Sequence, residues 1–173
     1  MDKAIQNSII RFFLLWAIQV FFLKQVSWGW GGETYLQIHI YPLFILLLPL
    51  RTLRSISLGV AFILGLLVDW WYESPGMHAG ALVFTAFMRV VVLGILTPRE
   101  GYNIKANPTK SSLGANWFIQ YAGAMLFLHL FFYYSLEAFT FVYFTTILLK
   151  LFFSWLASML VLLIVIYIFN PEA

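Results

Sequence analysis

The sequence predicts an all-α, polytopic membrane protein with six transmembrane helices in one integral membrane domain, residues 1–173. Of its 173 residues, 62% are hydrophobic and only 10% are charged, whereas soluble domains have about 25% charged residues. A soluble domain of this size could not bury so much apolar side chain, because small domains expose much of their surface. The composition therefore excludes an ordinary soluble domain, a disordered chain and a nucleic-acid-binding module.

Six apolar segments are read as spans, since a spanning helix needs about 20 residues. Their approximate bounds are 8–23, 35–50, 55–72, 79–96, 116–135 and 141–169. No small-residue cleavage site follows the first segment, so we expect a retained helix rather than a signal peptide. The second segment contains Pro42 and ends at Pro49, so we expect it to be kinked. A tight turn around Pro75-Gly76 joins the third and fourth segments.

The basic residues predict the orientation of these spans. With the N-terminus in the cytoplasm, only Lys24 falls in an outer loop, and seven basic residues fall at or near the inner side. The seven are Lys3, Arg11, Arg51, Arg54, Arg99, Lys105 and Lys110. Because Lys and Arg are enriched in short cytoplasmic loops, both termini are predicted to be cytoplasmic. The chain has no cysteine, which excludes disulfides and thiolate metal sites.

Ionisable residues within spans are candidate functional residues, because charges in a membrane are costly and face protein or water. Asp69 and Glu73 lie one turn apart on the third span, and the fourth carries His78 and Arg89 on nearly one face. The side chains of Asp69 and Arg89 lean toward each other in an antiparallel pair, so we expect them to form an ion pair. The alternative is that each extends alone to its own interface. Glu73 and His78 are expected at the rim of a cavity.

Small residues and one polar loop provide candidate contact surfaces. Helices can approach closely at small residues, for internal packing or for binding a partner helix, and the candidates are Gly59, Ala61, Gly65 and Gly123. The polar loop after the fourth span is either a basic, lipid-contacting loop or a docking surface for a cytoplasmic partner. Its candidate contact residues are Arg99, Glu100, Tyr102, Lys105 and Lys110.

No catalytic residue, metal site or cofactor is expected. Asp69, Ser74 and His78 are the residue types of a nucleophile triad, but the chain has no G-x-S-x-G elbow and no identifiable oxyanion donor. His39, His78 and His129 lie on three segments without the spacing of metal ligands.

Four short motifs occur in order within residues 35–110: Tyr41–Pro49, Gly65–Asp69, Ser74–Ala79 and Pro98–Tyr102. Together they resemble the bacterial rod shape-determining MreD family, in the form seen in Bacteroidota. Relatives often have Arg-Pro where this chain has Arg89-Val90, a departure that argues against a kink in the fourth helix.

The resemblance implies a non-catalytic scaffold of the cell-elongation (rod) complex in the bacterial inner membrane, supporting cell shape and lateral peptidoglycan synthesis. It implies binding of the single-span protein MreC, and association with RodA, penicillin-binding protein 2 and, indirectly, MreB. Membrane lipid is the other expected partner. The family is also similar in fold to the substrate-binding (S-component) subunits of energy-coupling-factor vitamin transporters. A small-molecule binding subunit of such a transporter is therefore the alternative function.

Reporter fusions test the predicted topology. A reporter active only in the periplasm should be active when fused at Gly76 and inactive when fused at Asn107, because the basic residues place Asn107 on the cytoplasmic side. Activity at Asn107, or none at Gly76, would contradict the topology.

Overall fold

The computed structural model describes residues 3–99, 101–102 and 107–169 of the chain. Within these residues, five helices are long and apolar enough to cross a membrane: Gln6–Gln25, Arg54–Tyr72, Met77–Ile95, Ala115–Ala138 and Phe144–Ile168. By length and composition, these helices identify a mostly helical, multi-pass membrane protein.

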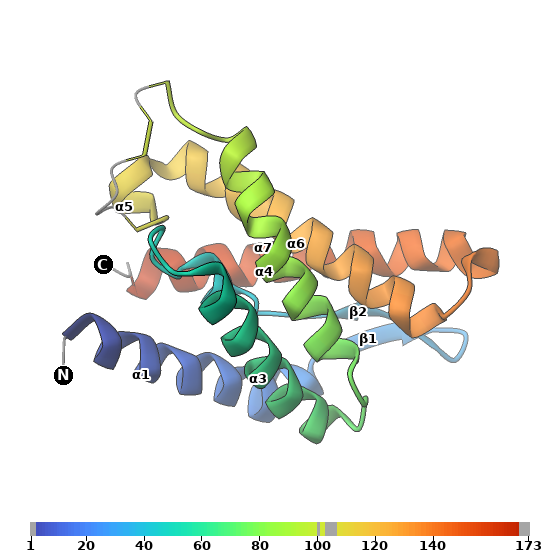
Figure 1. The fold of residues 1–173 in the computed structure, drawn as a ribbon. Helices are drawn as coiled ribbons and strands as arrows, with labels where there is room; N and C mark the ends of the chain where they lie inside the picture. The colour runs from blue at the N-terminus through green and yellow to red at the C-terminus, as the bar shows by residue number, and fades with distance from the viewer. Residues whose placement is uncertain (1–2, 100, 103–106, 170–173) are drawn as a thin grey trace.

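The elements follow one another along the membrane normal in alternating directions. In chain order they are α1 (Lys3–Ala17), a π-helical turn (Ile18–Phe22), a 3-10 turn (Leu23–Gln25), β1 (Ser27–Trp30), β2 (Glu33–Gln37), α2 (Leu43–Leu46), α3 (Arg54–Tyr72), α4 (Met77–Ile95), α5 (Lys110–Leu113), α6 (Ala115–Ala138), a 3-10 turn (Phe141–Tyr143) and α7 (Phe144–Phe169). Helix α1 begins and α7 ends at the same end of the molecule (Figure 1). The opposite end, which we call the hairpin end, carries the β1–β2 hairpin and the α3–α4 and α6–α7 turns.

The expected second span, 35–50, is not a continuous helix, and this prediction was wrong. Its first residues belong to β2, its middle is extended, and only α2 is helical. Pro42 cannot lie within a helix interior because it lacks the donor for the preceding turn, and it stands here as the N-cap of α2. The segment runs from the hairpin end toward the end where α1 begins (Figure 1).

Residues of this segment form the centre of the hydrophobic core. Ile40, Ile45 and Leu46 are fully buried, and α2 contacts α1, α4 and α6. Non-helical backbone is tolerated at membrane depth only where protein surrounds it. The five long helices therefore form a shell around a non-helical central segment.

The two-stranded hairpin was not expected from the sequence. Gly31 and Gly32 form its turn with φ of +64° and +84°, values that glycine adopts without steric cost. The rings of Trp30 and Tyr35 stack across the strands, with centroids 4.1 Å apart. The exposed side chains of Trp28 and Trp30 suit the headgroup zone.

Helices α3 and α4 pack at very short distance through small residues. A Cβ atom built on Gly65 would lie 2.3 Å from the Cα of Ala79, and Ala61 is fully buried. Gly59 is exposed, and a Cβ built on it would meet nothing within 4 Å. Of these small residues, Ala61 and Gly65 therefore serve internal packing, whereas Gly59 faces outward.

Alanine substitutions at the two α3 glycines should have opposite effects on stability. Gly65→Ala should lower the free energy of unfolding by about 2 kcal/mol or more, because the new methyl group forces the α4 backbone away. Gly59→Ala should raise it by about 0.5–1 kcal/mol, because alanine favours an exposed helix. Denaturation in detergent measures both, and equal effects at the two positions would contradict the packing described.

Candidate functional site

The interior of the bundle holds a polar network that hydrogen-bonds the backbone of the central segment. On α7, the Ser154 hydroxyl accepts a bond from the Gln37 N–H at 3.0 Å, and the Ser158 hydroxyl accepts one from the His39 N–H at 2.8 Å. The two serines lie one helical turn apart and are fully buried. They substitute for a neighbouring strand, because they satisfy the backbone where β2 has no partner on that side.

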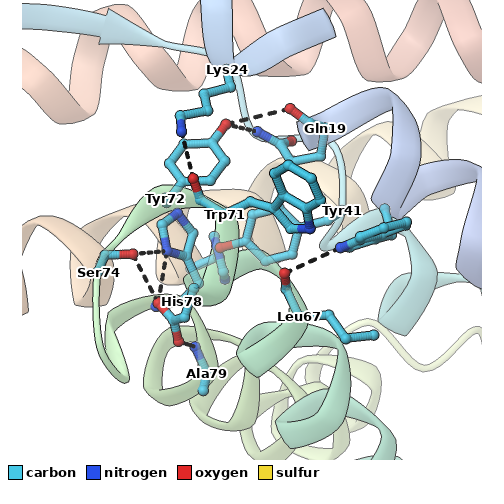
Figure 2. Close-up of polar contacts among 12 residues, drawn as sticks. Gln19, Lys24, Tyr41, Leu67, Trp71, Tyr72, Ser74, His78 and Ala79 are labelled. Atoms are coloured by element: carbon cyan, nitrogen blue, oxygen red, sulfur yellow. Dashed lines mark hydrogen bonds and ion pairs between the residues drawn. The ribbon is translucent and has the colours of Figure 1, made fainter. Parts of the chain in front are cut away.

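Gln19 from the π-helical turn supports the same segment from the opposite direction. Its Oε1 accepts a bond from the Ile40 N–H at 2.8 Å, and its Nε2 donates to the Ile38 carbonyl at 3.0 Å. The side-chain amide thus pairs with the backbone as another strand would, and it also donates to the Tyr72 hydroxyl at 2.8 Å (Figure 2). π-Helical turns frequently occur at functional sites, and here the turn positions this amide.

Arg89 binds the end of the central segment and does not pair with Asp69. Its guanidinium donates to the backbone carbonyls of Leu48 and Pro49 and to the Tyr121 hydroxyl. The Tyr121 hydroxyl donates in turn to the Leu46 carbonyl at 3.2 Å. These carbonyls lack helical partners because the chain leaves α2 there, and Arg89 and Tyr121 satisfy them.

Asp69 instead caps the start of α4. Its two carboxylate oxygens accept bonds from the His78 and Ala79 N–H groups, both at 2.9 Å. The N-cap residue itself, Gly76, has no side chain for this purpose. A carboxylate stabilises a helix N-terminus through its free N–H groups and its dipole. The expected Asp69–Arg89 ion pair is therefore absent, because each residue binds a different piece of backbone.

Ser74 and His78 meet Asp69 in an arrangement that differs from a catalytic triad (Figure 2). Ser74 Oγ lies 2.8 Å and Asp69 Oδ1 lies 3.0 Å from the same ring nitrogen of His78, Nδ1. A triad needs the serine and the carboxylate on opposite nitrogens. Ser74 also donates to Asp69 at 2.9 Å, so all three side chains form one closed cluster that stabilises the α3–α4 turn.

Glu73 lies outside this cluster. It is the exposed C-cap of α3, with a left-handed φ of 55°. Of the four residues expected to form one polar cluster, only Asp69 and His78 are in contact, because the chain turns away from the bundle after Tyr72.

The three histidines of the chain come together in the core, which the sequence analysis did not predict. The ring of His39 lies 6.0 Å from that of His78 and 6.1 Å from that of His129, between centroids. His129 hydrogen-bonds Tyr41 through Nε2 and Thr85 through Nδ1, both at 2.8 Å. They come from three separate elements, so no local spacing in the sequence could indicate their meeting.

Two ring nitrogens of these histidines have no hydrogen-bond partner among the described residues: His39 Nδ1 and His78 Nε2. Both rings are almost fully buried. Across the described ranges, no three His, Cys, Asp or Glu residues are arranged to hold a metal ion. The two nitrogens are therefore unused hydrogen-bonding capacity within a tyrosine-rich core, where Tyr133 contacts both rings.

A second polar cluster lies at the hairpin end. Lys150 on α7 pairs with Glu137 of α6 at 2.9 Å and with Glu33 of β2 at 3.3 Å. These residues line a pocket of about 370 Å³, together with Tyr134 and Tyr143. The sequence analysis missed this site because Lys150 lies within an apolar segment and its partners come from other elements.

The polar loop makes contacts within its own chain. The Tyr102 hydroxyl donates to the Leu93 carbonyl at 2.8 Å, and burial raises the pKa of that hydroxyl, so it stays a donor. The ammonium group of Lys110 lies 3.9 Å from the centre of the Tyr167 ring. Arg99 is exposed, whereas Glu100 and Lys105 lie outside the described residues.

An apolar groove opens on the outer surface between α4, α6 and α7. It has a volume of about 490 Å³, and its lining includes Gly123, Ala124, Ile95, Phe127 and Trp155. A second groove shares Phe127 and Trp155 and continues along α7 over Leu148, Leu151 and Phe152. Gly123 also accepts a hydrogen bond from the Trp155 indole at 2.9 Å, so it supports the groove wall as well as its floor.

No family model matches this chain, and no curated protein or solved structure matches it either. Its function is therefore inferred from its residues and their geometry.

Removing the Asp69 carboxylate should strongly destabilise the protein. Asp69→Ala leaves two backbone N–H groups and the Ser74 hydroxyl without an acceptor, at a cost of about 3 kcal/mol or more. Glu73→Ala is the matched control, since Glu73 is exposed at the same turn, and it should change stability by less than about 0.5 kcal/mol. Denaturation in detergent measures both; similar losses would contradict the capping role.

The effects of Asp69→Asn and Arg89→Gln should add. The two side chains contact different segments, and mutations at separate sites combine within about 0.5 kcal/mol. A double-mutant cycle on the free energy of unfolding measures the coupling. A double variant more stable than the sum of the two losses, by 1 kcal/mol or more, would restore the ion pair that the structure lacks.

Proposed function

We propose that this chain is a non-catalytic membrane scaffold of the bacterial cell-elongation complex, and that it binds the single-span protein MreC. The groove lined by Gly123 and Ala124 carries the proposal. The four motifs within residues 35–110 give the complex its name, through their resemblance to the MreD family.

The groove has the properties of a site for a transmembrane helix. Lipid tails are as apolar as the helix faces they contact, so helices associate in membranes through close packing at small residues. Ala124 is exposed on α6 beside Gly123, and both residues lie in the groove lining. Ile95 is 76% exposed and Phe127 45% exposed, which leaves their side chains free to pack around an incoming helix.

The polar interior supports a scaffold rather than an enzyme. Asp69, Ser74 and Arg89 are engaged by backbone and by one another, so none is free to act as a nucleophile or base. In this proposal the membrane is the bacterial inner membrane, and both termini are cytoplasmic. The proposed complex holds RodA and penicillin-binding protein 2, with MreB bound indirectly.

The pocket at the hairpin end favours the alternative function, a small-molecule binding subunit of an energy-coupling-factor transporter. Its volume of about 370 Å³ falls within the range of small-ligand sites. Lys150, Glu33 and Glu137 would supply charges of both signs to a ligand.

Filling the groove should abolish partner binding without unfolding the protein. Ala124→Trp should reduce the MreC recovered by affinity purification by about tenfold or more, because blocking the centre of an interface costs 2 kcal/mol or more. Gly59→Trp is the matched control, since Gly59 is an equally exposed small residue on another helix, and it should leave recovery unchanged. Melting temperatures in detergent should be unchanged for both.

Equal recovery of MreC with Ala124→Trp and with the wild type would overturn the groove as the site. Recovery of an ATPase module with a bound vitamin, in place of elongation proteins, would support the transporter alternative.

A further inference from the structure

A third groove lies between α1 and α7, with α2 at its floor. Its volume is about 420 Å³. Arg11 and Asn7 supply its polar lining, and the rest is apolar: Ile10, Leu14, Leu15, Leu43, Leu47, Val165 and Ile166. The termini of α1 and α7 mark this end of the molecule (Figure 1). The groove is separate from the one proposed for MreC, which lies between α4, α6 and α7.

Arg11 has no charge partner in this groove. It makes no hydrogen bond or ion pair with any residue in the described ranges, and it is partly buried. It lies five residues inside the span that begins at Gln6, which is a depth of about 8 Å at the helical rise. An unpaired cation at such a depth is costly, so the groove is electrostatically incomplete as the chain alone builds it.

The groove is polar at one end and apolar along the rest. Asn7 and Arg11 lie one turn apart on α1, and Leu14 and Leu15 continue the same side of the helix toward the membrane centre. Leu43 and Leu47 are almost fully buried beneath it, so its floor is fixed. This sequence of a cation, an amide and then an apolar channel has the polarity of one half of a phospholipid molecule.

We propose that this groove binds an anionic phospholipid. The phosphate group accepts charge-assisted hydrogen bonds from the Arg11 guanidinium, with the Asn7 amide as a second donor. An acyl chain lies over Leu14, Leu47 and Ile166. The net negative charge of the lipid compensates the one cation that the chain leaves unpaired there, and basic pockets between spans are known to select such headgroups. This inference goes beyond the scaffold function and holds for either function proposed above.

Native mass spectrometry of the full-length protein in detergent tests the inference. Phosphatidylglycerol and phosphatidylcholine with matched acyl chains are added in turn, and the retained lipid is counted. The wild type should retain phosphatidylglycerol in preference. Arg11→Gln should lower that retention about fivefold, the value of one basic contact near the membrane surface. Leu14→Trp, which fills the apolar channel, should lower retention of both lipids.

Arg51→Gln is the matched control, because Arg51 is exposed between α2 and α3 and does not line the groove. It should retain phosphatidylglycerol like the wild type, and all variants should melt at the same temperature in lipid-free detergent. Equal retention by Arg11→Gln and wild type would overturn the site. An equal loss with Arg51→Gln would show diffuse attraction rather than a site, and a groove closed by a second copy of the chain would show dimers that Leu14→Trp dissociates; either result overturns the proposal.

Discussion

Backbone polar groups in a membrane interior must be hydrogen-bonded within the protein, because no water is present to replace the missing partners. This chain places a non-helical segment, residues 37–49, at the centre of its bundle, so the constraint is especially severe here. The surrounding helices meet it with polar side chains directed inward: Gln19, Arg89, Tyr121, Ser154 and Ser158. The arrangement of α1, α4, α6 and α7 around the segment depends on these bonds.

The constraint also explains which polar residues are structural. An arginine or aspartate in a span attracts a functional interpretation, because its burial is costly. Here Arg89 and Asp69 each bind backbone that would otherwise be unsatisfied: carbonyls after α2 for Arg89, and N–H groups at the start of α4 for Asp69. The polar groups left with capacity to bind something else are fewer, and they lie at other places: Arg11 in its groove, and the cluster of Lys150 with its two glutamates.

Hydropathy predicted the five long helices correctly, because a helix exposed to lipid needs a long apolar run. It failed for residues 35–50, since a segment buried on all sides has the same composition whether it is helical or not. Pro42 indicated a break, but a kinked helix and an extended chain both accommodate it. Helical periodicity placed Asp69 and Arg89 on facing sides of an antiparallel pair, yet their actual partners come from a turn and from a third element. Such contacts depend on tertiary structure, as does the meeting of the three histidines.

The two serines of α7 impose an order on biogenesis. The bond from the Gln37 N–H to Ser154 joins residues 117 positions apart, and at ordinary translation rates of about 5–20 residues per second the acceptor is made roughly 6–25 s after the donor. During that interval the central segment has no complete set of partners in the nascent chain. The segment must therefore wait in a hydrated or insertase-shielded environment, and the bundle closes only when its last helix inserts. A ribosome that stops before α7 releases a chain with open backbone groups in its centre, which is the kind of defect that membrane quality-control proteases recognise.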